Sequence, residues 1–229
     1  MLNQLKNIFQ SDKPDNRNVE PPPKTDPITG NLMDDLVYLR AKFGVSADLT
    51  IRRIHIDGHE AAVVTIEGMV DRHMMADAVI LPMASIQGQY TPEALMAHIR
   101  DDVLGFVDML QVTTMQEMVN LIASGFGAIL VNGVPYAVLG GLQAFMIRSV
   151  GEPSTEVTIR GSREGFTEAI RVNISMIRRR LKTPELTFEM MTAGKTSNTA
   201  VCLCYMKNRV SDRLLEDVRA RIAALPLDV

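Results

Sequence analysis

The sequence predicts an α/β (α+β) protein of two lobes, each with a mixed or antiparallel sheet flanked by helices. Three observations lead to this prediction. Short apolar runs alternate with apolar stripes at helical spacing. Several strand pairs are joined by short turns, which favours antiparallel neighbours. Many helices are expected to begin at Ser, Thr or Asp residues that can cap their first N–H groups. The 229 residues can bury enough surface to fold without disulfides or metals.

The composition divides the chain into three parts. Residues 1–30 are expected to be a disordered tail, because residues 11–30 are polar and proline-rich and cannot bury apolar surface. Residues 31–148 are predicted to form the first α/β subdomain and residues 149–229 the second. A dense polar segment, residues 152–168, crosses the junction between the two.

The first subdomain should open with an amphipathic helix that ends at Gly44. The runs LTIRRIHID and AAVVTIEG flank Gly58 and predict a hairpin. A methionine-rich helix then begins at an Asp71 cap and is expected to be disrupted near its end by Pro82.

A second helix should begin at Thr91 and present an apolar face. That face would consist of Leu95, Ile99, Val103, Phe106 and Leu110. Thr114 has the spacing of a capping box and predicts a shorter helix. The charge-free stretch 118–147 has the length of a membrane helix, but its glycines and the turn signal Asn132-Gly133 favour a buried β-hairpin.

The second subdomain is predicted to hold a long helix, two strands and a final helix. The long helix has the apolar stripe Phe166, Ile170, Ile174, Ile177 and Leu181. The runs LTFEMMTAG and TAVCLCYMK should be the strands. Ser211 should cap the last helix, whose inward residues would be Leu214, Val218, Ile222 and Leu225. Both ends of the chain therefore share the order α-β-β-α, a candidate degenerate internal repeat, although chance similarity explains it equally well.

The motifs do not support an enzyme, a cofactor or a metal site. Gly194-Lys195 resembles the end of a phosphate loop, but the required glycine at position 189 is a glutamate, so a hairpin turn is favoured. The four histidines fit no ligand spacing. Cys202 and Cys204 would point to the same face of a strand, so we expect buried, reduced thiols in a reducing compartment.

Charge suggests two surface features. The net charge of −3 and the absence of Trp argue against a nucleic-acid partner. A basic face on the long helix is interpreted either as a solvated face or as a contact for an anionic surface, such as lipid headgroups or an acidic protein. Its residues are Arg171, Arg178, Arg179 and Lys182.

The polar segment EPSTEVTIRGSREGFTE combines opposite charges with glycines that can bend the chain. This composition suits a clamp that couples the two lobes or contacts a ligand between them. The residues proposed for this role are Glu152, Glu156, Arg160, Arg163, Glu164 and Glu168.

The same segment carries a family resemblance. EPSTE, then RG, then REGFTE, then a helix ending in IRRRLK resembles the A subunits of the GerA family of spore-germination receptors. The likeness is dense from Arg148 to Leu186 and looser up to the end. Ser162 departs from the family pattern, which usually has proline after RG.

The resemblance implies a function that composition could not. Such subunits have a cytoplasmic N-terminal region followed by membrane-spanning helices, and they work with other receptor subunits in the inner membrane of the spore. This chain would then be a non-enzymatic sensing and assembly module of a nutrient germinant receptor, attached to the membrane through a C-terminal region beyond Val229. The alternatives are a small-ligand-binding module with a cleft between the lobes, or a subunit of the related dipicolinate-channel branch.

Overall fold

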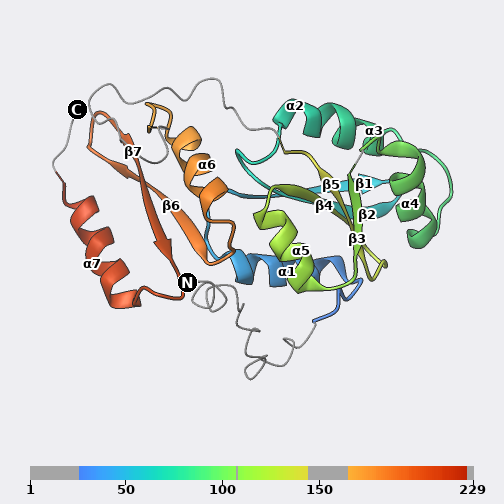
Figure 1. Ribbon diagram of the computed structural model, residues 1–229, viewed down its shortest axis with the longest axis horizontal. Helices are drawn as coiled ribbons and strands as arrows, with labels where there is room; N and C mark the ends of the chain where they lie inside the picture. The colour runs from blue at the N-terminus through green and yellow to red at the C-terminus, as the bar shows by residue number, and fades with distance from the viewer. Residues whose placement is uncertain (1–25, 107, 144–164, 226–229) are drawn as a thin grey trace, which may run out of the picture.

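The computed structural model describes residues 26–106, 108–143 and 165–225, and these form two lobes that lie side by side (Figure 1). The first lobe holds a five-stranded sheet and the second a two-stranded sheet. The strand pairs of both sheets are antiparallel. The predicted α+β fold of two lobes is therefore confirmed. The predicted boundary at 148/149 lies outside the described residues.

The sheet of the first lobe has the strand order β1-β2-β4-β5-β3. Its strands are β1 (Leu49–Ile56), β2 (His59–Ile66), β3 (Met109–Val112), β4 (Phe126–Val131) and β5 (Ala137–Gly141). The β1–β2 hairpin turns at Asp57 and Gly58, whose φ angles of 48° and 82° fit the tight turns that match strand twist. Strands β4 and β5 form the hairpin expected in the charge-free stretch.

Helices cover both faces of this sheet. On one face lie α1 (Leu32–Phe43) and α5 (Met115–Ala123). On the other lie α2 (Arg72–Met75), the π-helical segment η2 (Ala76–Ile80), α3 (Leu81–Ala84), α4 (Pro92–His98) and the π-helical segment η3 (Ile99–Val103). The predicted caps are confirmed, because Asp71, Thr91 and Thr114 each accept a hydrogen bond from a backbone N–H in the first turn. A separate apolar core fills each side of the sheet.

Pro82 disrupts its helix near the end, as predicted: the preceding turn widens into the π-helical segment η2, in which Leu81 N–H donates to the carbonyl of Ala76, and the helix ends at Ala84. Two other expectations for the first lobe are wrong. Leu110 is not on a helix face; it lies in β3 and is 43% exposed. Order begins before Asn31, since Ile28 is buried and Pro27 pairs with Thr114.

The second lobe is a hairpin between two helices. Its elements are α6 (Ile170–Arg180), β6 (Leu186–Ala193), β7 (Thr199–Met206) and α7 (Asp212–Ala223). Gly194, with φ 86°, lies in the turn between the strands, which confirms the hairpin interpretation of Gly194-Lys195. The helix–strand–strand–helix order is confirmed at both ends of the chain; a common origin of the two units stays a prediction.

The second lobe has a thin core. Its buried apolar cluster consists of Ile174, Leu186 and Phe188. Helix α6 begins at Ile170, so Phe166, which is 71% exposed, and Leu181, which is 47% exposed, do not belong to its buried stripe.

Helix α7 also packs differently from the prediction. Leu215 is its buried residue, whereas Leu214 and Leu225 are exposed. The helix lies against a hairpin of only two strands, which is too small to cover a full apolar stripe.

Candidate functional site

The surface where the two lobes meet is the most elaborate polar site among the described residues. Its centre is Arg178 on α6, which is completely buried. Arg178 Nε donates to Asp48 Oδ2 at 2.8 Å and Nη2 donates to Asp48 Oδ1 at 3.2 Å. Asp48 lies in the loop before β1 and is 3% exposed. A bidentate, desolvated ion pair therefore joins the two lobes.

The remaining donors of Arg178 are also satisfied. Nη1 donates to the carbonyl of Thr183 at 2.6 Å, and Nη2 donates to the carbonyl of Leu186 at 2.8 Å. The guanidinium lies 5.1 Å from the centre of the Phe188 ring. A buried charge is tolerated when it is paired and hydrogen-bonded, and each of the three guanidinium nitrogens of Arg178 donates a hydrogen bond.

The loop before β1 also binds the backbone of the second lobe. Ala47 N–H donates to the carbonyl of Phe188 at 2.7 Å. Phe188 N–H donates to Ser46 Oγ at 3.1 Å, and Ser46 Oγ donates to Asp48 Oδ1 at 2.6 Å. Residues 46 and 47 therefore satisfy both backbone groups of Phe188 in β6, and Ser46 holds the Asp48 carboxylate in place.

A second contact lies at the far end of β2. There α6 approaches so closely that a Cβ on Gly68 would lie 2.6 Å from Ser175 Cβ. Next to it, Arg171 of α6 forms an ion pair with Glu67, and Arg72 lies 3.8 Å from the same carboxylate. The glycine thus permits the approach that brings Arg171 to Glu67.

A third contact joins the end of α1 to the end of β7. Lys207 Nζ donates to the carbonyl of Lys42 and, at 3.4 Å, to the carbonyl of Ala41. These carbonyls belong to the last turn of α1, where a cation complements the helix dipole. The second lobe thus caps a helix of the first.

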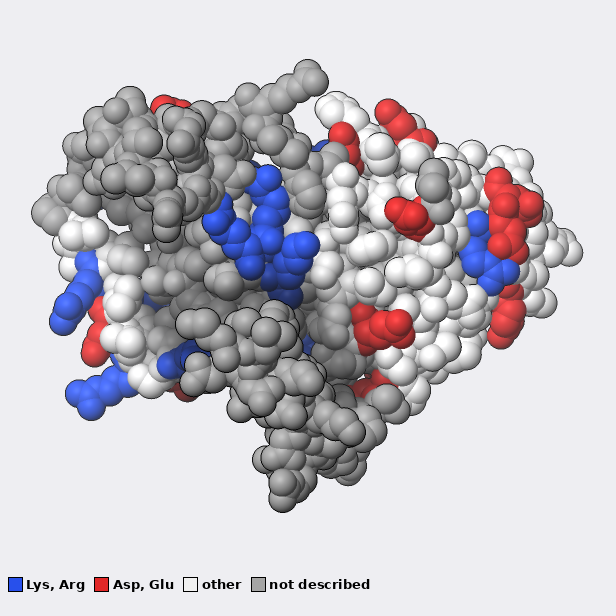
Figure 2. All heavy atoms as spheres, in the orientation of Figure 1, with Lys and Arg blue, Asp and Glu red and all other residues white. Residues whose placement is uncertain are grey.

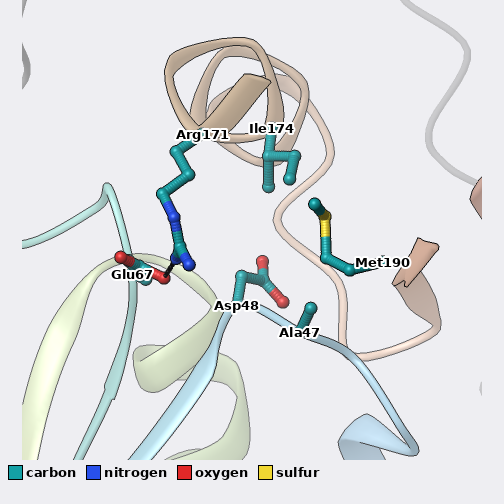
Figure 3. A pocket seen from close by; sticks show the side chains of 6 residues that line it. All are labelled: Ala47, Asp48, Glu67, Arg171, Ile174 and Met190. Atoms are coloured by element: carbon teal, nitrogen blue, oxygen red, sulfur yellow. Dashed lines mark hydrogen bonds and ion pairs between the residues drawn. The ribbon is translucent and has the colours of Figure 1, made fainter. Parts of the chain in front are cut away.

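These contacts enclose a small pocket between the lobes (Figure 3). Figure 3 shows Arg171 and Ile174 reaching down from α6 toward Asp48 and Glu67. Ala47 and Met190 complete the lining. The pocket has a volume of about 40 Å³, enough for a few water molecules and far below the roughly 300 Å³ at which small-molecule sites begin.

The structure separates the residues predicted for the basic face. The prediction that Arg178 lies on an exposed face is wrong, because its side chain is directed into the junction between the lobes and pairs with Asp48. Arg171 and Lys182 are exposed and Arg179 is half-buried. Figure 2 shows a group of Lys and Arg side chains near α6, so a basic surface exists without Arg178.

Of the residues predicted to couple the lobes, Glu168 is exposed just before α6. The others, Glu152, Glu156, Arg160, Arg163 and Glu164, lie outside the described residues. The structure therefore does not test this predicted clamp, but it shows a different connection made by Asp48, Glu67 and Gly68.

The sequence did not indicate that Asp48, Glu67 and Arg178 form contacts between the lobes. Asp48 precedes β1 and Glu67 follows β2, positions at which charged residues are ordinary surface residues. Arg178 lies 130 positions after Asp48. The one available signal was that Arg178 belongs to a helix whose other face is apolar, which leaves its partner unspecified.

The thiols and histidines show no catalytic arrangement in the described part of the chain. Partial burial raises the pKa of Cys202 to about 11, and it also raises the pKa of Cys204. Both shifts oppose thiolate formation. The expectation that both cysteines are buried is wrong, because Cys202 is half-buried and the Cys204 residue as a whole is exposed. Within residues 26–106, 108–143 and 165–225 no group of three or more His, Cys, Asp and Glu side chains could hold a metal ion.

None of the helices in those ranges combines the length and apolar character needed to cross a bilayer.

Solved structures show the same fold. The crystal structure of the N-terminal domain of the A subunit of the Bacillus megaterium spore germinant receptor GerK3 aligns with a TM-score of 0.68 and 23% identity. The alignment covers 88% of this chain and 74% of that one. At this identity the likeness supports the fold alone.

Several curated relatives are named as spore germination or sporulation proteins. Spore germination protein KA of Bacillus subtilis is 30% identical over 204 residues, which cover 88% of this chain and 37% of the relative. Spore germination protein GerLA of Bacillus cereus is 29% identical over 206 residues, covering 88% of this chain and 41% of the relative. Stage V sporulation protein AF of Bacillus subtilis is 28% identical over 193 residues, covering 82% and 38%. This chain thus spans about two fifths of the length of these relatives.

The sequence pattern of one family matches residues 37–229, which include α6 and all three contacts between the lobes. The resemblance carried by residues 148–186 is therefore confirmed over most of the chain. The protein belongs to the Bacillus/Clostridium GerA family of spore germination proteins.

Proposed function

We propose that this chain is the N-terminal region of the A subunit of a nutrient germinant receptor, where it acts as a non-enzymatic sensing and assembly module. The observation that carries the proposal is the family match over residues 37–229, together with relatives named as germination proteins. The proposed place is the core side of the spore inner membrane, reached through a C-terminal region beyond this chain. The proposed partners are other receptor subunits.

The contacts between the lobes suggest how such a module would work. Three separate polar contacts fix one lobe against the other, and the pocket between them is too small for a nutrient. The module therefore presents a two-lobed surface of defined shape to its partners. A nutrient could enter between the lobes only if Arg171 and Glu67 separated.

A deletion in the parent spore tests the function. Removing the gene should slow germination triggered by nutrients while leaving dipicolinate content and germination by non-nutrient triggers unchanged. Restoring the gene should restore the nutrient response. Unchanged nutrient-triggered germination, in spores where other receptors have been removed, would reject the proposal.

The same experiment examines the second candidate, a subunit of the dipicolinate-channel branch. We keep this candidate because one relative, Stage V sporulation protein AF, is named for sporulation rather than for germination. It predicts a change in dipicolinate content or release with every trigger rather than with nutrients alone.

The proposal also assigns roles to two parts of the surface. The polar segment with Arg160, Arg163 and Glu168 is proposed to couple the lobes; it lies largely outside the described residues, so this proposal rests on the sequence. Alanine variants at the three positions should keep the subunit abundant in spores yet slow germination.

Arg171, Arg179 and Lys182 are proposed to contact an anionic surface of lipid or of a partner subunit. In low salt the Lys182→Glu variant should bind anionic vesicles or the partner more weakly than the natural chain does. Equal binding in both assays would leave only a solvated face.

A further inference from the structure

The first lobe carries a groove beside the junction of the lobes, and of its lining residues Glu67 also takes part in a contact between the lobes. It lies where the helical segment from Arg72 to Leu81 faces the end of the β1–β2 hairpin opposite its turn. Its volume of about 580 Å³ falls within the roughly 300–1,000 Å³ range of small-molecule sites. The groove is therefore large enough for a small molecule, unlike the pocket of about 40 Å³ between the lobes.

The floor of the groove is apolar. Its apolar lining residues are Val70, Met75, Ala76, Ile80 and Leu81. Leu81 is 62% exposed, a large apolar side chain at the mouth of the groove. Ala76 and Ile80 belong to the π-helical segment η2, and π-helical turns are found frequently at functional sites. An apolar ligand body would remove this surface from water.

The rim of the groove is cationic. Arg52 of β1 lines it, and within the described residues Arg52 has no ion-pair partner. Arg72 also lines it; its side chain is 82% exposed and lies 3.8 Å from Glu67. Glu67, the acidic residue of the lining, is already engaged by Arg171 of the second lobe. An anion could therefore bind Arg52 directly and Arg72 in place of its exposed, 3.8 Å pairing with Glu67.

We infer that this groove binds a small anionic amphiphile, a molecule with an apolar body and one carboxylate or phosphate head. The apolar body would lie on Met75, Ile80 and Leu81, and the head would be held by Arg52 and Arg72. Guanidinium groups bind both kinds of head through paired hydrogen bonds. The inference does not depend on the proposed function, because it concerns binding by this chain alone.

The ligand would lie beside the junction of the lobes. Glu67 lines both the groove and the pocket between the lobes. An anion on Arg72 would compete with Glu67 for that guanidinium and leave Glu67 to Arg171 alone.

The test uses the 229-residue chain and four probes of equal chain length, each below its micelle concentration. Octanoate and octyl phosphate carry the predicted head, octanol carries no charge and octylammonium carries the opposite charge. Binding is followed by calorimetry and by the methyl signal of Met75, assigned with the Met75→Leu variant. Both anions should bind saturably and shift the Met75 signal, and octanol and octylammonium should bind at least tenfold more weakly.

Three variants locate the site. Arg52→Gln and Arg72→Gln should each weaken octanoate binding at least fivefold, and Leu81→Ser should weaken every probe that binds. Arg53→Gln is the matched control, because Arg53 lies on the opposite face of β1 and pairs with Glu60. The four side chains are exposed, so the variants should fold, which circular dichroism checks.

Three outcomes would overturn the inference. One is the absence of saturable binding by either anion. Another is equal affinity for octanoate and octanol, which would remove the role of the arginines. The third is an equal loss in Arg53→Gln, or binding without a shift at Met75, which would place the site elsewhere.

Discussion

Gly68 and Gly58 occupy similar backbone conformations but differ in their neighbours. Their φ angles are 79° and 82°, both in the left-handed region. A Cβ on Gly58 would meet nothing within 4 Å, whereas a Cβ on Gly68 would lie 2.6 Å from Ser175 Cβ. Comparing alanine substitutions at the two glycines therefore separates the cost of backbone strain from the cost of a clash between the lobes.

We expect Gly58→Ala to lower the free energy of unfolding by roughly 1–2 kcal/mol, the cost of the left-handed conformation. Gly68→Ala should cost that amount plus about 1–3 kcal/mol, because α6 must move away from the first lobe. Urea denaturation of the two variants measures both values. Equal destabilisation would show that α6 is not held against Gly68.

At the scale of elements, α7 is attached to the hairpin of the second lobe by a charged pair. Arg219 Nε and Nη2 each donate to the Glu189 carboxylate at 2.8 Å. These hydrogen bonds hold the pKa of Glu189 below its ordinary value of 4.5, and they raise the pKa of Arg219. Since Leu215 is the buried residue of α7, this pair is a large part of the attachment.

The lowered pKa gives the attachment a pH dependence. A carboxylate whose pKa is lower in the folded state stabilises that state above its unfolded pKa, and the stabilisation is lost as pH falls through the folded pKa. The protection factors of amides in α7, which correct for the intrinsic pH dependence of exchange, should therefore fall below pH 4.5 more than those in α5. Arg219→Gln should show fast exchange in α7 already at pH 7, whereas Arg213→Gln on the same helix should not. Slow exchange in α7 of Arg219→Gln would contradict this view.

The elements differ in how well the sequence predicted them. Caps and turns such as Thr114 and Asn132-Gly133 were predicted because their signals are local. Leu110 was misplaced because β3 follows a helical stripe without a break in apolar spacing. Arg178 was placed on the surface because its partner, Asp48, is brought near only by the folded chain. Local chemistry was predictable, and contacts between distant segments were not.

At the scale of the whole molecule, the two lobes are unequal. The first has an apolar core on each side of its sheet, whereas the second has a buried cluster of Ile174, Leu186 and Phe188. A core that small provides little stability of its own. The second lobe therefore depends on its contacts with the first, above all on Arg178 and Asp48.

We expect the natural chain to unfold in one calorimetric transition and Asp48→Ala to unfold in two. Removing one partner of a buried pair costs about 3–5 kcal/mol, because the other charge stays buried and unpaired. The added transition, at lower temperature, should belong to residues 165–225. Glu67→Gln should keep a single transition, since Arg171 in that pair is largely exposed and such pairs contribute about 0–1 kcal/mol. A single transition in Asp48→Ala would show that the ion pair does not couple the lobes.

The separation of Asp48 and Arg178 along the chain has a consequence for synthesis. The two residues are 130 positions apart, and ribosomes add about 5–20 residues per second, so Asp48 waits roughly 7–26 s for its partner. The first lobe is completed through β5, which ends at Gly141, before that interval ends, and the Asp48 carboxylate keeps the future docking surface hydrated. A nascent chain that would otherwise expose an apolar patch thus exposes a charge, until α6 leaves the ribosome and neutralises it.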